Sequence, residues 1–169
     1  MKKLILFFTL ILAVGCIRAQ TPTTIPPYSI VTSDSMKATP ATLKHRRTML
    51  IYFSPDCPHC QHLTMDMKQK MKEFGDTQIL MITWSNNYDI RAIKNFVRDY
   101  DLKKYPNITV GTEGYSYVVQ KYYDIKTTPF VAIFNSKGQL VKSFNKDPEV
   151  SDLIKAVKTA DTVKKAKAA

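Results

Sequence analysis

The sequence predicts an α/β domain in which helices flank a central mixed β-sheet. Buried strand segments alternate with amphipathic helical segments along the chain, and a β-hairpin and one more helix follow them. The composition fits such a domain, because 44% of the 169 residues are hydrophobic and 23% are charged. A chain of this length suffices for one domain with a sizeable core.

Two apolar strands with a helix between them open the predicted sheet. Residues 48–53 (TMLIYF) and 78–84 (QILMITW) are short apolar and aromatic runs, as in buried strands. Between them, apolar residues recur at helical spacing over residues 59–74, and Gly75 follows as a stop.

The next segment repeats the alternation with shorter elements. An apolar stripe beginning at Ile90 predicts a helix, residues 108–110 a short strand, and residues 115–123 a short helix. Each of these segments is bounded by polar or turn-forming residues. The pattern up to this point is therefore strand-helix-strand-helix-strand-helix.

A hairpin and a final helix complete the domain. Residues 130–134 and 140–144 read as two strands joined by the turn at residues 136–138. Asp147 and Pro148 then predict a helix start, with an acidic cap and a proline in the first helical position. An apolar stripe lines one face of this last helix.

The first residues are typical of an export signal. Two lysines precede residues 4–14, a run of 11 uncharged residues that is too short to span a bilayer but has the length of a signal-peptide core. We expect either a signal peptide of residues 1–19 or a lipoprotein leader of residues 1–15 that ends before Cys16. In both cases the protein is exported to the periplasm or cell envelope, and in the second a lipid on Cys16 attaches it to the membrane.

The rest of the chain divides into three parts. Residues 20–27 (QTPTTIPP) are rich in proline and threonine, and we expect an extended tether there. Residues 28–160 form the single predicted domain, and residues 161–169 a basic, solvated tail. No internal repeat is visible in the sequence.

The positive charge has a modest bearing on function. Lys and Arg number 25 against 14 for Asp and Glu, which gives a net charge of +11. Such a balance can serve nucleic acids or anionic membranes. Here the lysines are spread along the chain, and three basic residues lie in the expected leader. We therefore expect no nucleic-acid partner.

We expect the two cysteines outside the leader to be the reactive residues. Cys57 and Cys60 lie in the sequence SPDCPHC, directly after a buried strand and directly before an amphipathic helix. The free N–H groups of a helix N-terminus stabilise a thiolate at the first cysteine, and the thiolate is the nucleophile. The second cysteine follows within one turn, close enough to form a disulfide with the first.

The two residues between the cysteines tune this pair. Pro58 fits the first helical turn, where its missing N–H is not needed. His59 adds a dipole or a positive charge beside the thiolate, which lowers the pKa of Cys57 further and makes the disulfide more oxidising.

Two simpler interpretations of the cysteine pair fit less well. A disulfide that closes so short a loop removes little chain entropy, so it would be a poor structural staple. A zinc site needs a second pair of ligands at a distance, and the three histidines all precede the midpoint of the predicted helix. We expect no metal and no cofactor in the site.

At this point the chain resembles the thioredoxin superfamily, specifically exported thiol:disulfide oxidoreductases of the TlpA/ResA type. Residues 28–31, the turn at 33–35 and residues 42–43 resemble the N-terminal β-hairpin of that type, while Cys-Pro-His-Cys resembles the active site of DsbA-type oxidases. The resemblance implies a thioredoxin-like fold with an N-terminal β-hairpin extension. It also implies protein thiols or disulfides as substrates and a second protein as redox partner.

A second motif extends the resemblance to the substrate side. Residues 126–130 (KTTPF) resemble the threonine–cis-proline motif of the family. Carried over, Pro129 lies against the cysteines, and Thr128 and Pro129 form the edge on which substrates dock. Trp84, at the end of the second strand, either lines this docking surface or packs as a rim or core aromatic.

The chain also departs from the family pattern. Classical thioredoxins have a buried aspartate where this chain has Ile51, and ResA-type reductases have a glutamate where it has Leu63. The proton acceptor for Cys60 is therefore unidentified. The long helical insertion of the oxidases is missing as well, so the direction of exchange (reductase, oxidase or isomerase) stays open.

One alternative of a different class remains, a thioredoxin-fold protein that binds or delivers copper. Its ligands would be Cys57 and Cys60, with His59 beside them. Copper chaperones that resemble SCO proteins use a wider cysteine spacing and a distal histidine, which this sequence does not provide.

Overall fold

The computed structural model describes residues 22–44, 46–84 and 90–162, so the expected leader and most of the expected tail lie outside the described residues. The described strands are β1 (Ile30–Thr32), β2 (Lys37–Ala38), β3 (Thr48–Tyr52), β4 (Gln78–Thr83), β5 (Ile108–Thr112), β6 (Phe130–Phe134) and β7 (Leu140–Phe144). The described α-helices are α2 (Pro58–Gln69), α3 (Ile90–Asp99), α4 (Val118–Tyr123) and α5 (Val150–Thr159). Short 3-10 helices cover Pro40–Thr42, Met71–Phe74 and Leu102–Lys104.

The seven described strands form one mixed sheet in the order β2-β1-β5-β4-β3-β6-β7. The three central strands β5, β4 and β3 run parallel, whereas β1 and β6 pair with them in antiparallel fashion. The hairpin of β1 and β2 lies at one edge and the hairpin of β6 and β7 at the other. The predicted fold class is confirmed, and β1 and β2 form the N-terminal β-hairpin. Residues 42–43, which the resemblance assigned to this hairpin, instead lie at the end of the 3-10 helix that follows β2.

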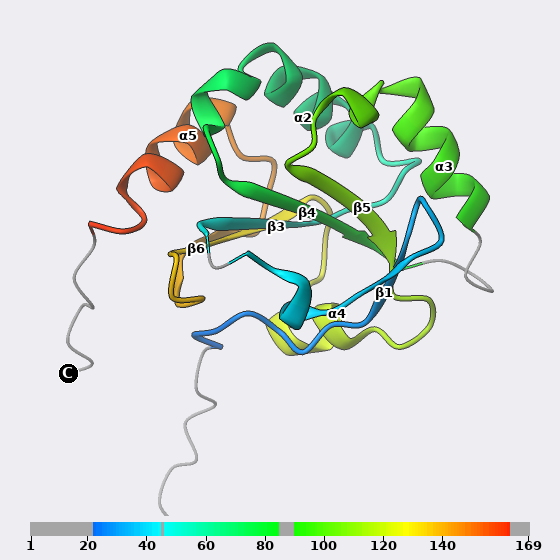
Figure 1. Cartoon of the computed structure of the whole chain (residues 1–169), viewed down its shortest axis with the longest axis horizontal. Coiled ribbons are helices and arrows are strands. Elements are labelled where there is room, and N and C mark those ends of the chain that lie inside the picture. The colour runs from blue at the N-terminus through cyan, green and yellow to red at the C-terminus, as the bar shows by residue number, and fades with distance from the viewer. Residues whose placement is uncertain (1–21, 45, 85–89, 163–169) are drawn as a thin grey trace, which may run out of the picture.

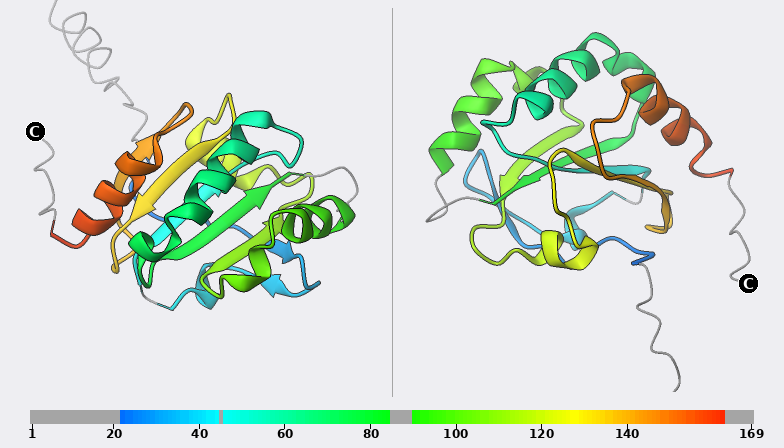
Figure 2. Two further views of the ribbon diagram at one scale, coloured as in Figure 1. Left: turned by 90° about the horizontal axis from the view of Figure 1, so that it is seen from above. Right: turned by 180° about the vertical axis from the view of Figure 1, so that it is seen from behind.

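The sheet separates two hydrophobic cores. Helices α2, α3 and α5 cover one face, while α4 and the N-terminal segment cover the other (Figures 1 and 2). Alternate residues of β3 face the two sides, as the period of a strand requires: Met49, Ile51 and Phe53 pack under the three helices, and Leu50 and Tyr52 pack toward α4. Both cysteines lie on the three-helix side.

The helix predicted over residues 59–74 is divided in two. The α-helix ends at Gln69, and a 3-10 turn over Met71–Phe74 follows it, in which the Glu73 N–H donates to the Lys70 carbonyl at 2.9 Å. Such tightening is common at a helix C-terminus. Gly75 then takes a left-handed φ of 58° and ends the segment, as its sequence position predicted.

Helix α4 begins three residues later than the sequence predicted. Tyr117 has a left-handed φ of 49°, so the helix cannot start before Val118. The start is held by Glu113, a buried carboxylate that accepts a 3.0 Å hydrogen bond from the Val119 N–H and a 2.7 Å hydrogen bond from the Tyr52 hydroxyl. Glu113 thus joins the end of β5 to β3 and to α4.

Helix α5 also starts later than predicted, which corrects the role of Asp147 and Pro148. The N-cap is Glu149, whose backbone is extended, and the first helical residue is Val150. Asp147 does not cap the helix, and its carboxylate instead contacts the imidazole of His59 in α2. Pro148 lies in the connection between β7 and α5.

The described part of the expected tether, residues 22–27, lies against the domain. The Leu140 N–H donates to the Thr23 carbonyl at 2.7 Å, and Thr24 pairs with Gln139 as an isolated bridge. The Tyr123 hydroxyl donates to the Thr24 carbonyl at 2.9 Å. The N-terminal segment therefore connects β7 with α4 on the lower face in Figure 1.

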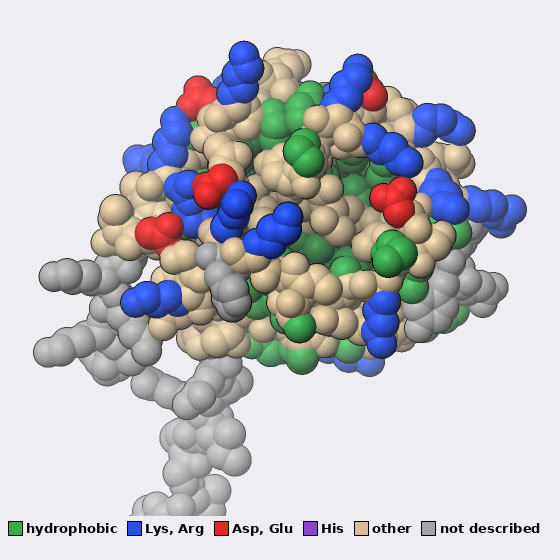
Figure 3. Space-filling model, in the orientation of Figure 1, with side chains coloured by type: hydrophobic (Ala, Val, Ile, Leu, Met, Phe, Trp, Pro, Cys, Tyr) green, Lys and Arg blue, Asp and Glu red, His purple; other side chains and the backbone are tan. Residues whose placement is uncertain are grey.

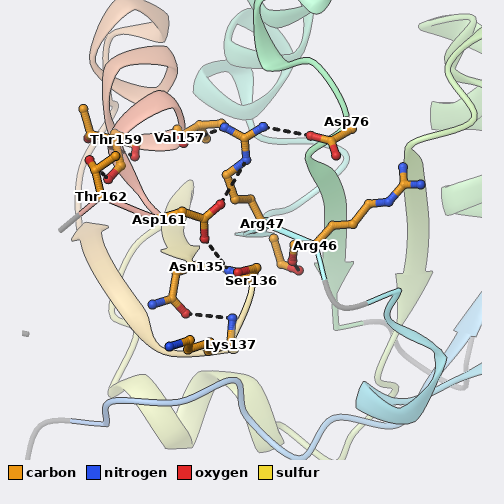
Figure 4. A network of polar contacts seen from close by, with 12 residues as sticks. Arg46, Arg47, Asp76, Asn135, Ser136, Lys137, Val157, Thr159, Asp161 and Thr162 are labelled. Atoms are coloured by element: carbon orange, nitrogen blue, oxygen red, sulfur yellow. Dashed lines mark hydrogen bonds and ion pairs between the residues drawn. The ribbon is translucent and has the colours of Figure 1, made fainter. Parts of the chain in front are cut away.

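Arg47 connects α5 to the start of β3. Its guanidinium donates to Asp76 at 2.8 Å and to the Val157 carbonyl at 3.3 Å, and it lies 3.8 Å from Asp161 (Figure 4). Asp161 in turn accepts a 2.8 Å hydrogen bond from the Ser136 N–H. One side chain thus holds the C-terminal helix at the end of the sheet opposite Cys57.

Charged residues are dispersed over the surface. Lys and Arg side chains are spread over the face shown in Figure 3, with Asp and Glu between them. Within the described residues, no helix is long and apolar enough to cross a membrane.

The buried contacts of Glu113 predict a large effect of its removal. Glu113→Ala should lower the free energy of unfolding by about 3 kcal/mol, because the Tyr52 hydroxyl and the Val119 N–H would each lose a buried partner. Urea denaturation measures this change. Glu73→Ala, which breaks an exposed ion pair with Lys158, is the matched control and should have a much smaller effect. Equal effects of the two changes would contradict the role given to Glu113.

Candidate active site

The motif lies where β3 ends and α2 begins. Cys57 is the N-cap residue of α2, with an extended backbone (φ −81°, ψ 117°), and Pro58 occupies the first helical position. The Cys57 N–H donates to the Ser54 carbonyl at 3.1 Å, and its own carbonyl accepts from the Gln61 N–H at 3.0 Å. The predicted position of the pair at a strand-to-helix junction is confirmed.

The sheet register brings the threonine–proline motif to the same place. Tyr52, the last residue of β3, pairs with Phe130, the first residue of β6. The residues just before β6 therefore lie beside the residues just after β3. The Thr128–Pro129 peptide bond is cis, Pro129 is buried, and the Thr128 carbonyl lies 3.6 Å from the Cys57 sulfur.

Cys57 has an acidic thiol. Burial raises the pKa of Cys57, but hydrogen bonds to its sulfur outweigh burial, and the pKa is lowered from its ordinary value. These hydrogen bonds come from the backbone and the thiol of Cys60, from the side chain of Thr128 and from the backbone of His59. The free N–H groups at the start of α2 thus act on the sulfur as a helix N-terminus acts on an anion.

Cys60 has the opposite character. It is 1% exposed, and this burial, together with the hydrogen bond and the repulsion from Cys57, raises the pKa of Cys60 to about 12. Both are free cysteines in this structure. The pair therefore consists of a partly exposed, acidic thiol and a buried thiol that retains its proton.

His59 acts on the pair through its backbone. The sequence placed its imidazole beside the thiolate, whereas in the structure Nδ1 lies 2.8 Å from Oδ2 of Asp147, in the connection from β7 to α5. The His59 group that lowers the pKa of Cys57 is the backbone N–H. Asp147 was noticed in the sequence only as a helix cap, because its contact with His59 spans 88 positions of the chain.

The two positions at which the sequence departs from the family pattern also have apolar surroundings in the structure. Ile51 and Leu63 are both buried in the core under the three helices. The residues that shift the pKa of Cys60 are Ser54, Cys57 and Thr128, so no carboxylate of the described chain is among them. Nor do the described residues include a group of three or more His, Cys, Asp or Glu side chains that could hold a metal ion. The copper-binding alternative thus gains no additional ligand.

A cavity of about 320 Å³ opens beside the threonine–proline motif, on the α4 side of the sheet. Trp84 and Tyr52 form its aromatic wall, with their rings stacked at 5.6 Å. Thr128 lines the cavity and also contacts the Cys57 sulfur. Trp84 therefore lines the same cavity as Thr128, whose carbonyl contacts the Cys57 sulfur. Tyr52 was missed in the sequence because it reads as an ordinary buried strand residue.

Comparison with protein families gives one match. Residues 46–140 fit a family model described as thioredoxin-like. This range includes both cysteines and the threonine–proline motif. A search of curated proteins gave no match to the chain.

Solved structures with the same fold include oxidoreductases. A secreted Mycobacterium tuberculosis disulfide oxidoreductase homologous to E. coli DsbE is 18% identical, with a TM-score of 0.65 over 79% of this chain and 96% of that one. A thiol:disulfide interchange protein from Chlorobium tepidum is 19% identical, with a TM-score of 0.63 over 85% and 99%. A peroxiredoxin-like protein from Aquifex aeolicus is 16% identical, with a TM-score of 0.66 over 85% and 88%. At these identities the likeness shows the fold.

The unequal acidity of the two thiols predicts selective alkylation. In the reduced, folded protein, iodoacetamide should modify Cys57 first, with a rate that rises with pH and reaches half its maximum below pH 9.0, the ordinary pKa of the thiol. Cys60 should stay unmodified in this range, because its pKa of about 12 leaves it protonated. Peptide mass spectrometry across a pH series measures both rates. Equal rates in the folded protein would contradict the assignment, and the denatured chain provides the control in which both thiols react alike.

Proposed function

The chain belongs to the thioredoxin-like family, and from this premise we propose that it is an exported thiol-disulfide oxidoreductase whose Cys57–Cys60 pair exchanges with thiols and disulfides of other proteins. The observation that carries the proposal is the opposed acidity of two neighbouring thiols at the start of α2. Such a pair supplies a nucleophile and a protected second thiol in one site.

The exchange proceeds in two steps when the protein acts as a reductant. The Cys57 thiolate attacks one sulfur of the substrate disulfide, a bond between Cys57 and that sulfur forms, and the other substrate sulfur leaves as a thiolate. Cys60 then loses its proton and attacks the Cys57 sulfur, which releases the second substrate sulfur. The substrate gains two electrons, and the pair loses two as it becomes a disulfide.

The same atoms serve the reverse reaction. A substrate thiolate attacks Cys57 of the disulfide form, Cys60 leaves and takes up a proton, and a second substrate thiol displaces Cys57. The reduction potential of the pair relative to its partners decides the direction of net flow. A second protein must restore the starting form of the pair after each cycle.

Thr128 and Pro129 are proposed as the docking edge. Thr128 contacts the Cys57 sulfur and lines the cavity with Trp84. A substrate chain that lies along this edge, with its cysteine at Cys57, can place a neighbouring side chain in the cavity. Its aromatic wall favours an apolar or aromatic side chain at that position.

Export is proposed from the leader alone. The lysines and the apolar run of residues 4–14 precede the first described residue, so this part of the proposal depends on the sequence pattern. Removal of residues 1–19 would give an unattached protein, and a lipid on Cys16 would attach it to the membrane.

The roles of the two cysteines predict different trapping behaviour. Cys60→Ser should accumulate mixed disulfides with protein substrates, because Cys57 can still form the first bond but nothing resolves it. Cys57→Ser should trap none, since the thiol that remains is buried. Non-reducing gels of cells that express each variant show the difference. Trapping by Cys57→Ser alone would overturn the assignment.

The cavity predicts that a change at Trp84 lowers the activity toward a peptide with an apolar side chain more than the activity toward glutathione. Trp84→Ala should lower kcat/KM for a cysteine peptide with an apolar neighbouring residue by about tenfold, which corresponds to ~1.4 kcal/mol. Exchange with glutathione should change little, because glutathione lacks an apolar side chain for the cavity. Met65→Ala is a control, since Met65 is a solvent-exposed apolar residue on α2. An equal loss with both substrates would contradict a docking role.

A further inference from the structure

The imidazole of His59 is held by a carboxylate from a distant segment. Nδ1 of His59 lies 2.8 Å from Oδ2 of Asp147, and both side chains are more than half exposed. A carboxylate accepts hydrogen bonds, so Nδ1 carries the hydrogen in this contact. The ring is thereby directed toward the connection between β7 and α5.

This connection is itself fixed at the active site. The Thr127 hydroxyl donates to the Asn145 carbonyl at 3.1 Å, which ties the start of the connection to the docking edge. Phe144 before it and Val150 after it pack against the core that contains Cys60. Asp147 therefore lies on a short, anchored segment between the docking edge and α2.

The group of His59 that acts on the Cys57 sulfur is its backbone N–H rather than its imidazole. The Cys57 thiol donates to the Thr128 carbonyl at 3.6 Å, and the hydrogen bonds that lower its pKa include one from the backbone of His59. The exposed imidazole instead pairs with Asp147. The geometry thus separates the two parts of His59, with the N–H on the sulfur and the ring on the carboxylate.

We propose that Asp147 is a positioning residue for the exchange reaction: it holds the His59 imidazole off the Cys57 sulfur and so makes the pair a weaker oxidant than an unrestrained Cys-Pro-His-Cys motif. The inference rests on the proposed function of the cysteine pair. It assigns to the β7–α5 connection a part in setting the redox balance of the site.

The direction of the effect follows from charge. A protonated imidazole near the sulfur stabilises the thiolate and hence the dithiol form, which makes the disulfide more oxidising. Asp147 opposes this because it holds the ring on the β7–α5 connection. Removal of the carboxylate should therefore shift the equilibrium toward the dithiol. If Asp147 instead served to charge a ring that acts on the sulfur, its removal would shift the equilibrium the other way.

The test compares wild type, Asp147→Asn, His59→Ala and the double variant in a glutathione redox buffer. Asp147→Asn should move the equilibrium about fivefold toward the dithiol, the size expected for two unit charges about 4 Å apart in a water-like dielectric. Since a tenfold change is about 30 mV for this couple, the shift is ~20 mV. The Cys57 thiolate, followed by its ultraviolet absorbance, should titrate at lower pH in the same variant.

The double variant separates positioning from a direct charge effect. In the His59→Ala background, Asp147→Asn should leave the equilibrium unchanged, because no ring remains to be held. A shift of equal size in that background would overturn the inference, since Asp147 would then act on the sulfur by its own charge. No shift, or a shift toward the disulfide, in Asp147→Asn alone would overturn it as well.

Two further comparisons complete the experiment. Glu149→Gln removes a carboxylate from the same connection at another exposed position, and it should match wild type within twofold. A wild-type pair that does not equilibrate with glutathione at all would contradict the proposed function itself. A wild-type pair that does equilibrate, with Asp147→Asn equal to it, would contradict only the role of Asp147.

Discussion

The start of α2 at Cys57 is the constraint on which the chemistry of the site depends. Although burial acts against it, hydrogen bonding at the start of the helix lowers the pKa of Cys57, whereas burial is the main cause that raises the pKa of Cys60. Both environments follow from the helix start, because the N-cap residue Cys57 is extended, Pro58 begins the helix, and Cys60 lies on its buried first turn. A helix that started one turn earlier would carry Cys57 inside it, with fewer free N–H groups to stabilise a thiolate.

The sheet determines what surrounds this pair. The antiparallel register of β3 and β6 sets Thr128 and Pro129 against the residues after β3. The chain then returns through β7, so the connection to α5 passes the same edge and brings Asp147 to His59. Two segments therefore meet the cysteine motif at one end of the sheet: Thr128 lies 71 positions after Cys57, and Asp147 lies 88 positions after His59. Arg47 fixes α5 at the other end, which limits how far the connection can move.

Local features of the site could be predicted from the sequence, and long-range ones could not. The strand-to-helix junction at Cys57 follows from an apolar run, a proline and a helical stripe, all within residues 48–74. The position of Thr128 beside Cys57 was predicted only from the family resemblance, because the register between two strands cannot be derived from the sequence of either strand alone. Helix starts were less certain. Asp147 was predicted to cap α5 but instead contacts His59. Helix α4 starts later than predicted because Tyr117 has a left-handed backbone conformation.

The raised pKa of Cys60 has a consequence for the second step of the exchange. Burial is its largest cause. The hydrogen bond to the Cys57 thiolate and the repulsion from its charge are the other contributions that raise the pKa, and both end once the Cys57 sulfur is part of a mixed disulfide. The thiol of Cys60 therefore becomes more acidic at the moment when it must attack. In the proposed exchange, this change in charge at Cys57 favours the deprotonation of Cys60, for which Ile51 and Leu63 provide no carboxylate.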